Sequence, residues 1–339
     1  MKNSQPDKIL LAHGGGGQLS DSLIRNNILP KIINGPAERT DSASLELNSN
    51  SICFTTDSYV VKPLFFNGGD IGKLAVCGTV NDLAVAGAIP EALSLSLIIE
   101  TGLEFEVLDR ILESIGKTAE QSNVKIVTGD TKTVEQGSAD KIFINTAGLG
   151  CKVTGVNLGI GNIKPGDKII INGTIGDHGM TIMSQREGMK FQSDLASDCA
   201  CLSPLTVELL ENIAGIRFMR DPTRGGLAAT LNEIARERQL SVTINEQAIP
   251  VDPKVRAAAE MLGFDVLSIA NEGKVVIVVD PENAEQCLEM CKKTPLGEKA
   301  AIIGQVEQSG DIAVIEMNTK IGGRRIVSMP YGRELPRIC

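Results

Sequence analysis

The sequence predicts a two-domain α/β protein, or α+β if strands and helices segregate, and three observations lead to this fold class. A chain of 339 residues is long enough to bury two sizeable cores. Short apolar runs alternate with longer segments of helical periodicity. At residues 155–167 the stretch "GVNLGIGNIKPGD" interrupts this alternation with Gly, Asn and Pro. We therefore expect one domain at residues 1–152, a second at 153–329 and a mobile tail at 330–339.

The first half alternates strands with helices. Residues 91–100, "EALSLSLIIE", alternate Leu with Ser, which predicts a strand with one covered face. Residues 104–123 carry apolar side chains at helical spacing and predict an amphipathic helix. The remaining elements expected here are strands at 51–57, 124–131 and 140–150 and a helix at 71–87.

The second half resumes with the apolar strand "KIIING" at 168–173. A second continuous apolar run, "KVVIVV" at 274–279, predicts another buried strand. Further strands are expected at 300–306 and 311–317, and helices at about 177–188, 204–214, 223–238, 254–262 and 282–293.

Composition excludes several classes of partner. The net charge is −9 and there is no Lys/Arg block, so nucleic acid is not expected as a partner. The polar start "MKNSQPDK" lacks a signal-peptide core, and the longest plain apolar run, "VVIVV", is far too short to span a bilayer. A cytoplasmic location without a membrane partner is therefore expected.

The eight cysteines fit a reducing compartment and do not form a metal motif. The sequence contains no C-x-x-C and only two histidines, which gives a zinc site little support. Cys287 and Cys291 lie one helical turn apart, as on an apolar helix face, and Cys199 and Cys201 are expected to be small buried residues. Cys339, the last residue, has no evident structural role.

Carboxylates recur where predicted elements meet glycine or a turn. Oxygen ligands grouped at element ends suit Mg²⁺, which takes one or two carboxylates together with phosphate oxygens. Each acid also has a structural alternative, as an N-cap or a turn residue. The residues are Asp57 in "TTDS", Asp82 in "VNDLAVAG", Asp130 in "TGDT", Asp221 in "RDPTRGG" and Glu272 in "ANEGK".

Two glycine-rich stretches offer backbone N–H groups to an anion. "HGGGG" at 13–17 could close over phosphate, and "PTRGGL" precedes a predicted helix. Neither matches a standard phosphate motif, since no G-x-x-x-x-G-K-[ST] and no G-x-G-x-x-G occurs. A loose terminus is the alternative for the first stretch.

The tail "MPYGRELPRIC" is predicted to be extended, because Pro330 and Pro336 exclude a regular helix to the end. Ten such residues could reach on the order of 30 Å, enough to enter a cleft or to leave it for a partner. Arg337 favours the thiolate of Cys339 while the adjacent terminal carboxylate opposes it, so the direction of the pKa shift stays open.

Together these segments resemble the HypE family of hydrogenase maturation factors, over essentially the whole length. Aminoimidazole ribonucleotide synthetase, selenophosphate synthetase and thiamine-monophosphate kinase share the acidic motifs but not a terminal cysteine of this kind. The resemblance implies the two-domain PurM-like fold, with an ATP-binding N-terminal domain that also forms a homodimer. The matching segments are "LAHGGGGQ", "FTTDSYVVKPLFFNGGDIGKLAVCGTVNDLAVAGAIP", "IVTGDTKTV", "INTAGLG", "GDHGM", "RDPTRGGL", "NEGK" and the specific terminal "PRIC".

The resemblance also implies a reaction. Proteins of this family receive a carbamoyl group on the terminal cysteine, here Cys339, from the carbamoyltransferase HypF. They dehydrate it with ATP to a thiocyanate, and the cyanide passes to iron on the HypC–HypD complex for the nickel–iron hydrogenase site. Two alternatives remain. A small-molecule kinase or synthetase of the same superfamily would keep its ATP turnover without the tail, and a nucleotide-gated carrier would never modify the cysteine.

The resemblance assigns roles residue by residue. Cys339 is the substrate carrier, Glu272 the base and Lys132 a stabiliser of developing charge. Lys132 has the alternative of a solvated lysine at a strand end, and His178 could contact phosphate or fill a turn. The implied metal ligands are Asp57, Asp82, Asp130 and Asp221. The implied nucleotide-binding residues are His13, which has capping or packing as its alternative, with Gly14, Gly15, Gly16, Gly17, Asn81, Gly129 and Thr131.

Overall fold

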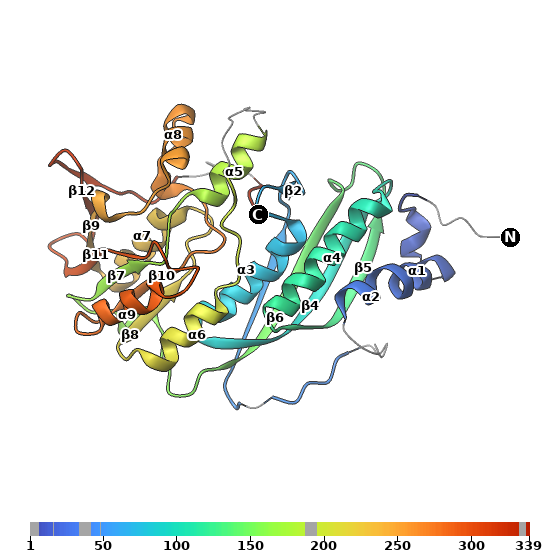
Figure 1. Ribbon diagram of the computed structural model, residues 1–339, viewed down its shortest axis with the longest axis horizontal. Coiled ribbons are helices and arrows are strands. Elements are labelled where there is room, and N and C mark those ends of the chain that lie inside the picture. The colour runs from blue at the N-terminus through green and yellow to red at the C-terminus, as the bar shows by residue number, and fades with distance from the viewer. Residues whose placement is uncertain (1–6, 16, 34–41, 48, 187–194, 332–336) are drawn as a thin grey trace.

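The computed structural model describes residues 7–15, 17–33, 42–47, 49–186, 195–331 and 337–339. Two β-sheets, each with its own helices, lie side by side along the long axis of the molecule (Figure 1). This mixed α/β architecture agrees with the class predicted from the sequence.

The first sheet has four strands in the order β1-β6-β4-β5. The neighbours β1–β6 and β6–β4 are antiparallel, whereas β4 and β5 are parallel. This order places β5 at the edge opposite β1. The strands are β1 (Ile52–Tyr59), β6 (Ile142–Lys152), β4 (Ala88–Glu100) and β5 (Lys125–Val134).

Helices α3 (Ile71–Val85) and α4 (Phe105–Gln121) pack on one face of this sheet (Figure 1). Asp70 caps α3 by accepting from the backbone N–H groups of Gly72 and Lys73, which satisfies two donors of its first turn. α4 buries its apolar stripe, including Leu108 and Ile111, as its periodicity predicts. The opposite face of the sheet is open, and Phe54 of β1 is 71% exposed there.

The second sheet has seven strands in the order β13-β12-β9-β11-β7-β10-β8. Its central strands are buried on both faces, which explains their continuous apolar runs. Ile169 and Ile171 belong to the core on the side of α7 (Gly226–Arg238), whereas Ile170 belongs to the core shared with α6 (Ser203–Asn212) and α9 (Ala284–Lys292). The strands are β7 (Lys168–Ile171), β8 (Ile216–Arg220), β9 (Leu240–Asn245), β10 (Val276–Val279), β11 (Ala301–Gln308), β12 (Ile315–Asn318) and β13 (Arg324–Ile326).

The structure also contains elements that the sequence analysis did not predict. They are the strands β8, β9 and β13, the hairpin of β2 (Phe65–Phe66) and β3 (Gly69–Asp70), and the N-terminal helices α1 (Gln18–Ser22), η2 (Leu23–Ile28) and α2 (Leu29–Ile32). The helix expected from residue 223 begins later, because Gly225 and Gly226 take positive φ angles. The helices of this half are α5 (Asp177–Arg186), α6 (Ser203–Asn212), α7 (Gly226–Arg238), α8 (Pro253–Leu262) and α9 (Ala284–Lys292).

The last three residues dock beside the segment that follows β1. Val60 N–H donates to a terminal carboxylate oxygen of Cys339 at 3.1 Å, and Lys62 N–H donates to the Arg337 carbonyl at 3.3 Å, an antiparallel pattern. Ile338 is 2% exposed and belongs to the core of the first sheet. The C-terminus thus lies near β2 and the start of α3 (Figure 1).

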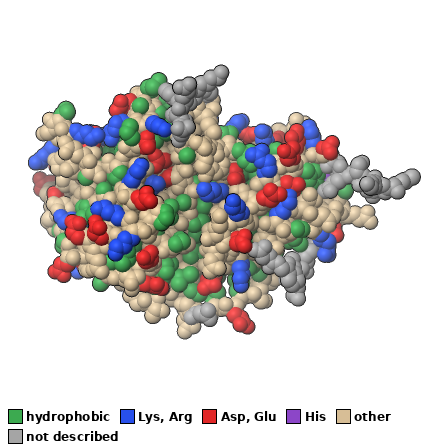
Figure 2. All heavy atoms as spheres, in the orientation of Figure 1, with side chains coloured by type: hydrophobic (Ala, Val, Ile, Leu, Met, Phe, Trp, Pro, Cys, Tyr) green, Lys and Arg blue, Asp and Glu red, His purple; other side chains and the backbone are tan. Residues whose placement is uncertain are grey.

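The surface carries both signs of charge. On the face in Figure 2, basic and acidic side chains are interspersed among apolar ones. Within the described ranges, none of the helices combines the length and the apolar character needed to cross a bilayer.

Candidate active site

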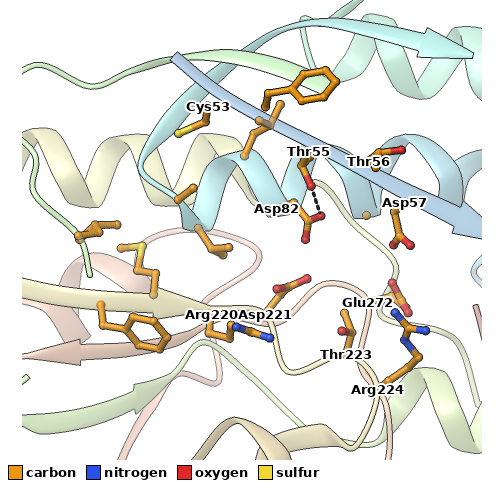
Figure 3. A pocket seen from close by; sticks show the side chains of 18 of the residues that line it. Cys53, Thr55, Thr56, Asp57, Asp82, Arg220, Asp221, Thr223, Arg224 and Glu272 are labelled. Atoms are coloured by element: carbon orange, nitrogen blue, oxygen red, sulfur yellow. Dashed lines mark hydrogen bonds between the residues drawn. The ribbon is translucent and has the colours of Figure 1, made fainter. Parts of the chain in front are cut away.

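A cavity of about 620 Å³ opens between β1 and α3 of the first sheet and the β8–α7 loop of the second half. Figure 3 shows the carboxylates that point into it from these distant segments. The ionisable and thiol side chains that line it are Cys53, Asp57, Asp82, Lys152, Arg220, Asp221, Arg224, Glu272 and Cys339.

β1 and α3 supply the first pair of carboxylates. Side chains alternate along β1, so Thr55 and Asp57 share the face that meets α3, where Asp82 lies. Thr55 Oγ1 donates to Asp82 Oδ2 at 2.8 Å. Burial raises the pKa of Asp82, and the charge of Asp57 raises it further. A cation between these two carboxylates would relieve their repulsion.

Asp221 lies in the β8–α7 loop, with Arg220 before it and Arg224 after it in the sequence. Burial raises the pKa of Asp221 to about 7, and the nearby Asp82 contributes. Glycine is required at the turn into α7, because a Cβ on Gly226 would lie 2.6 Å from the carbonyl oxygen of Ile269. The loop therefore runs close to the Glu272 segment and places Arg224 beside that acid (Figure 3).

The backbone that carries Glu272 is fixed by hydrogen bonds to Asp198. The carboxylate of Asp198 accepts from the N–H of Glu272 at 3.2 Å and from that of Gly273 at 3.3 Å. A Cβ on Gly273 would lie 1.9 Å from the Asp198 carbonyl oxygen, which explains the glycine of "NEGK". Glu272 is 4% exposed, and its Oε1 has no hydrogen-bond partner in the described part of the chain. Burial raises its pKa well above the ordinary value, so the ionised form is a strong proton acceptor.

Asn81 lies behind the cavity rather than in its lining. Its side-chain amide donates to the carbonyls of Ala200 at 3.0 Å and Glu272 at 3.1 Å. Its oxygen accepts from Leu202 N–H at 2.8 Å. In the structure Asn81 therefore ties α3 to the segment that carries Glu272.

The thiol of Cys339 faces Glu272 and Arg224 across the cavity lining. Burial raises its pKa to about 12, the negative charge of Glu272 adds to the shift and Arg224 opposes it. The sequence left the direction of the Cys339 pKa shift open, and in the structure this shift is upward. The docked thiol therefore stays protonated at neutral pH.

Asp130 and Lys132 do not line this cavity. They lie on β5 and pair with each other, with Lys132 Nζ 2.8 Å from Asp130 Oδ1 and both side chains largely exposed. Gly129, Asp130 and Thr131 instead line a separate cavity of about 290 Å³ against η2 and α2.

The glycine-rich stretch packs against β5 as well. His13, in the short helix η1 (Leu11–Gly14), is buried, accepts from Leu10 N–H at 2.9 Å and meets Phe105 edge-on. A Cβ on Gly14 would lie 2.2 Å from Thr133 Oγ1. A Cβ on Gly15 would make an ordinary contact, 3.5 Å from the Ala12 carbonyl oxygen, Gly17 has open surroundings, and Gly16 lies outside the described residues.

The carboxylates of the main cavity suit a hard cation without forming a complete site. Across the described ranges, no three His, Cys, Asp or Glu side chains lie close enough to hold a metal ion together. Asp57, Asp82 and Asp221 nevertheless face one opening. Besides burial, the charge of Asp57 raises the pKa of Asp82, and the charges of Asp82 and Asp57 raise the pKa of Asp221. Ligands from a bound phosphate would have to complete the coordination, as is usual for Mg²⁺.

Sequence reasoning overlooked several residues of this cavity. Thr55 and the two arginines, Arg220 and Arg224, line it without having been singled out. Both arginines flank Asp221 within "RDPTRGGL", so the motif itself contained the signal. Asp198, which orients the Glu272 backbone, stands in no quoted motif.

Comparison with known proteins gives relatives that match nearly the whole length of this chain. The N-terminal domain of AIR synthase related proteins matches residues 39–175, and the C-terminal domain of the same family matches residues 164–316. The carbamoyl dehydratase HypE of Rhizobium leguminosarum bv. viciae is 48% identical over 335 residues, which cover 98% of this chain and 95% of that protein.

Two solved structures extend the likeness to three dimensions. A crystal structure of hydrogenase maturation protein HypE in complex with ATP superposes with a TM-score of 0.94 at 44% identity, covering 97% of this chain and 99% of that one. A HypE–HypF complex gives a TM-score of 0.80 at 45% identity, covering 93% and 100%. These matches confirm the two-domain PurM-like fold predicted from the sequence.

Proposed function

The chain belongs to the HypE family of carbamoyl dehydratases, enzymes of hydrogenase maturation, and we propose that it dehydrates a carbamoyl group carried on its own Cys339. The product is a thiocyanate that supplies cyanide to the iron of the nickel–iron hydrogenase site. One observation carries this proposal: the Cys339 thiol lines the same cavity as Glu272, Asp57 and Arg224.

The proposed chemistry uses ATP to turn the amide oxygen into a leaving group. The carbamoyl oxygen attacks the γ-phosphate, ADP departs and one N–H proton is released to solvent, which leaves the oxygen in an imidate phosphate that keeps one N–H. Glu272 then accepts the remaining N–H proton, the C–O bond breaks with release of phosphate, and the carbon–nitrogen triple bond forms. The elements of water leave in the phosphate, so the step needs no further reagent.

We assign the nucleotide and its Mg²⁺ to the acidic side of the cavity. Asp57, Asp82 and Asp221 would hold the metal, which would neutralise the charge that develops on the phosphates. Arg220 and Arg224 add positive charge along the same lining. Buried carboxylates with raised pKa values favour this role, because a bound cation stabilises their ionised form.

We further propose a homodimer through the open face of the first sheet. Ile52 and Phe54 of β1 and Ile98 of β4 are 48%, 71% and 40% exposed there, which is apolar surface that a second copy would bury. Asp130 and Lys132 lie outside the cavity of their own chain and would act from the partner copy. In this arrangement residues 1–152 bind nucleotide and dimerise, 153–329 form the second domain, and 330–339 form the moving tail.

The partners follow from the reaction. We propose that a HypF-type carbamoyltransferase loads Cys339, in keeping with the HypE–HypF complex of a relative, and that a HypC–HypD complex receives the cyanide. Loading requires a reduced thiol, and all eight cysteines are unpaired in the structure. Free thiols persist in a reducing compartment, so we include a cytoplasmic location in the proposal.

The deciding experiment is the mass of the C-terminal peptide after incubation with ATP, carbamoyl phosphate and the transferase. We expect a carbamoyl adduct on Cys339 that loses one water only when ATP is present. The Cys339→Ala variant should keep ATP binding and show neither product. ATP-dependent turnover of a diffusible substrate by that variant would instead identify a small-molecule kinase or synthetase.

A further inference from the structure

A buried histidine holds the docked tail. His178, in the first turn of α5, is 0% exposed, and its Nε2 lies 2.8 Å from the carbonyl oxygen of Ile338. Its Nδ1 lies 2.8 Å from Ser197 Oγ. A carbonyl can only accept, so Nε2 carries the proton and Nδ1 accepts from the Ser197 hydroxyl. Burial lowers the pKa of His178, which keeps the ring in this neutral form.

The tail is recognised along both of its edges. The backbone oxygens of residues 337–339 alternate between two partners. The Arg337 carbonyl and a terminal carboxylate oxygen of Cys339 accept from the 60–62 segment, and the Ile338 carbonyl between them accepts from His178. The guanidinium of Arg186, at the far end of α5, also donates to the Arg337 carbonyl. The carbonyls of Arg337 and Ile338 and the terminal carboxylate of Cys339 therefore all have a partner.

This pattern defines the register of the tail. A slip by one residue would take the Ile338 side chain out of its buried site and the Cys339 side chain out of the cavity lining. The 60–62 segment alone offers backbone groups, which any residue could use. His178 adds a second constraint from the other side, because it meets a carbonyl only when Ile338 occupies its buried site.

We propose that His178 is a positioning residue for the dehydration step, one that sets the register and depth at which Cys339 enters the cavity. This inference rests on the proposed function. Loading by a transferase requires the tail to leave the cavity, so that step should not depend on His178. Dehydration requires the tail to be docked, so it should depend on the histidine strongly.

Three variants separate positioning from folding. His178→Phe retains a ring that can pack edge-on against Phe66, as the histidine does at 5.5 Å, but removes both hydrogen bonds. His178→Gln restores an N–H donor. Ser184→Ala is the matched control, because Ser184 is also buried on α5 and its hydroxyl has no hydrogen-bond partner in the described part of the chain.

Each variant is incubated with the transferase, carbamoyl phosphate and ATP, and the C-terminal peptide is followed by mass spectrometry. We expect His178→Phe to be carbamoylated at the parental rate and dehydrated roughly tenfold or more slowly, because a buried acceptor is left unpaired in the docked state. Iodoacetamide should alkylate Cys339 of His178→Phe faster than Cys339 of the parent. His178→Gln should recover much of the loss, and Ser184→Ala should match the parent in both steps.

Dehydration by His178→Phe at the parental rate would overturn the inference. So would a parallel loss of loading, dehydration and thermal stability, which would mark His178 as a fold residue. If the parent chain itself forms no thiocyanate, the proposed function fails. The alkylation rates then still test the inference, and equal rates in the parent and His178→Phe would overturn it.

Discussion

Truncating Ile338 should release the tail by a predictable amount. The side chain is 2% exposed in the core of the first sheet, and among the described residues of the tail Cys339 also packs against this core. Replacing a buried Ile with Ala costs about 2 kcal/mol or more. Since about 1.4 kcal/mol corresponds to a tenfold change in an equilibrium constant, Ile338→Ala should shift the docking equilibrium by roughly thirtyfold. Ile338→Val removes one methyl group, costs about 1 kcal/mol, and should shift it by roughly fivefold.

Alkylation of Cys339 by iodoacetamide at pH 8 measures this equilibrium. Docking raises the pKa of the thiol to about 12, so nearly all reactive thiolate comes from undocked chains. The rate on the C-terminal peptide should therefore increase from the parent through Ile338→Val to Ile338→Ala. Ile321→Ala serves as the control, because Ile321 is 96% exposed and should leave the rate unchanged.

The reasoning would be refuted if Ile338→Ala reacted at the parental rate, or if the valine variant reacted faster than the alanine variant. Either result would mean that apolar burial does not hold the tail in the cavity. A large fall in the melting temperature of Ile338→Ala would mean that the residue supports the whole core rather than the tail alone.

Three further predictions concern the cavity. Glu272→Gln should bind ATP and accept the carbamoyl group but form no nitrile, because the buried proton acceptor is gone; thiocyanate at the parental rate would require another base. Asp82→Asn should weaken nucleotide binding at limiting Mg²⁺, measured by calorimetry, because one anionic ligand is lost; an unchanged affinity would remove Asp82 from the metal site. Docking raises the pKa of Cys339, so docking is strongest below the ordinary thiol pKa of about 8.5 and weakens as the pH rises toward about 12. Hydrogen exchange at Val60 N–H, which donates to a terminal carboxylate oxygen of Cys339, should lose protection over that range in the parent but not in Cys339→Ala, and constant protection would contradict the shift.

The sequence could predict those cavity acids whose motif contains a glycine that the structure uses for close approach. Asp221 and Glu272 are examples: a Cβ at the neighbouring Gly226 or Gly273 would meet backbone atoms. Such local requirements are readable from short motifs. The elements that carry these residues were likewise predictable wherever hydrophobic periodicity was strong, as in α4 and β10.

The location of Asp130 could not be predicted in the same way, since it depends on strand order. The register aligns Asp57 on β1, Thr146 on β6, Leu95 on β4 and Gly129 on β5 at one level of the sheet. Three strand spacings of about 4.8 Å put β5 roughly 14 Å from β1. Sequence motifs do not encode which strands are neighbours, so "TTDS" and "TGDT" look equivalent along the chain although they lie at opposite edges.

The docked tail has a kinetic consequence. When the reacting group belongs to the same molecule as the site, its local concentration is set by geometry and does not change on dilution. The proposed dehydration should therefore be first order in protein, without saturation by its carbamoyl substrate. Each chain can also yield only one nitrile before it is unloaded. The amount of product is then limited by the number of chains and by the rate at which an acceptor removes the cyanide from them. The protein therefore behaves less like a conventional catalyst than like a loaded carrier that must be unloaded and reloaded.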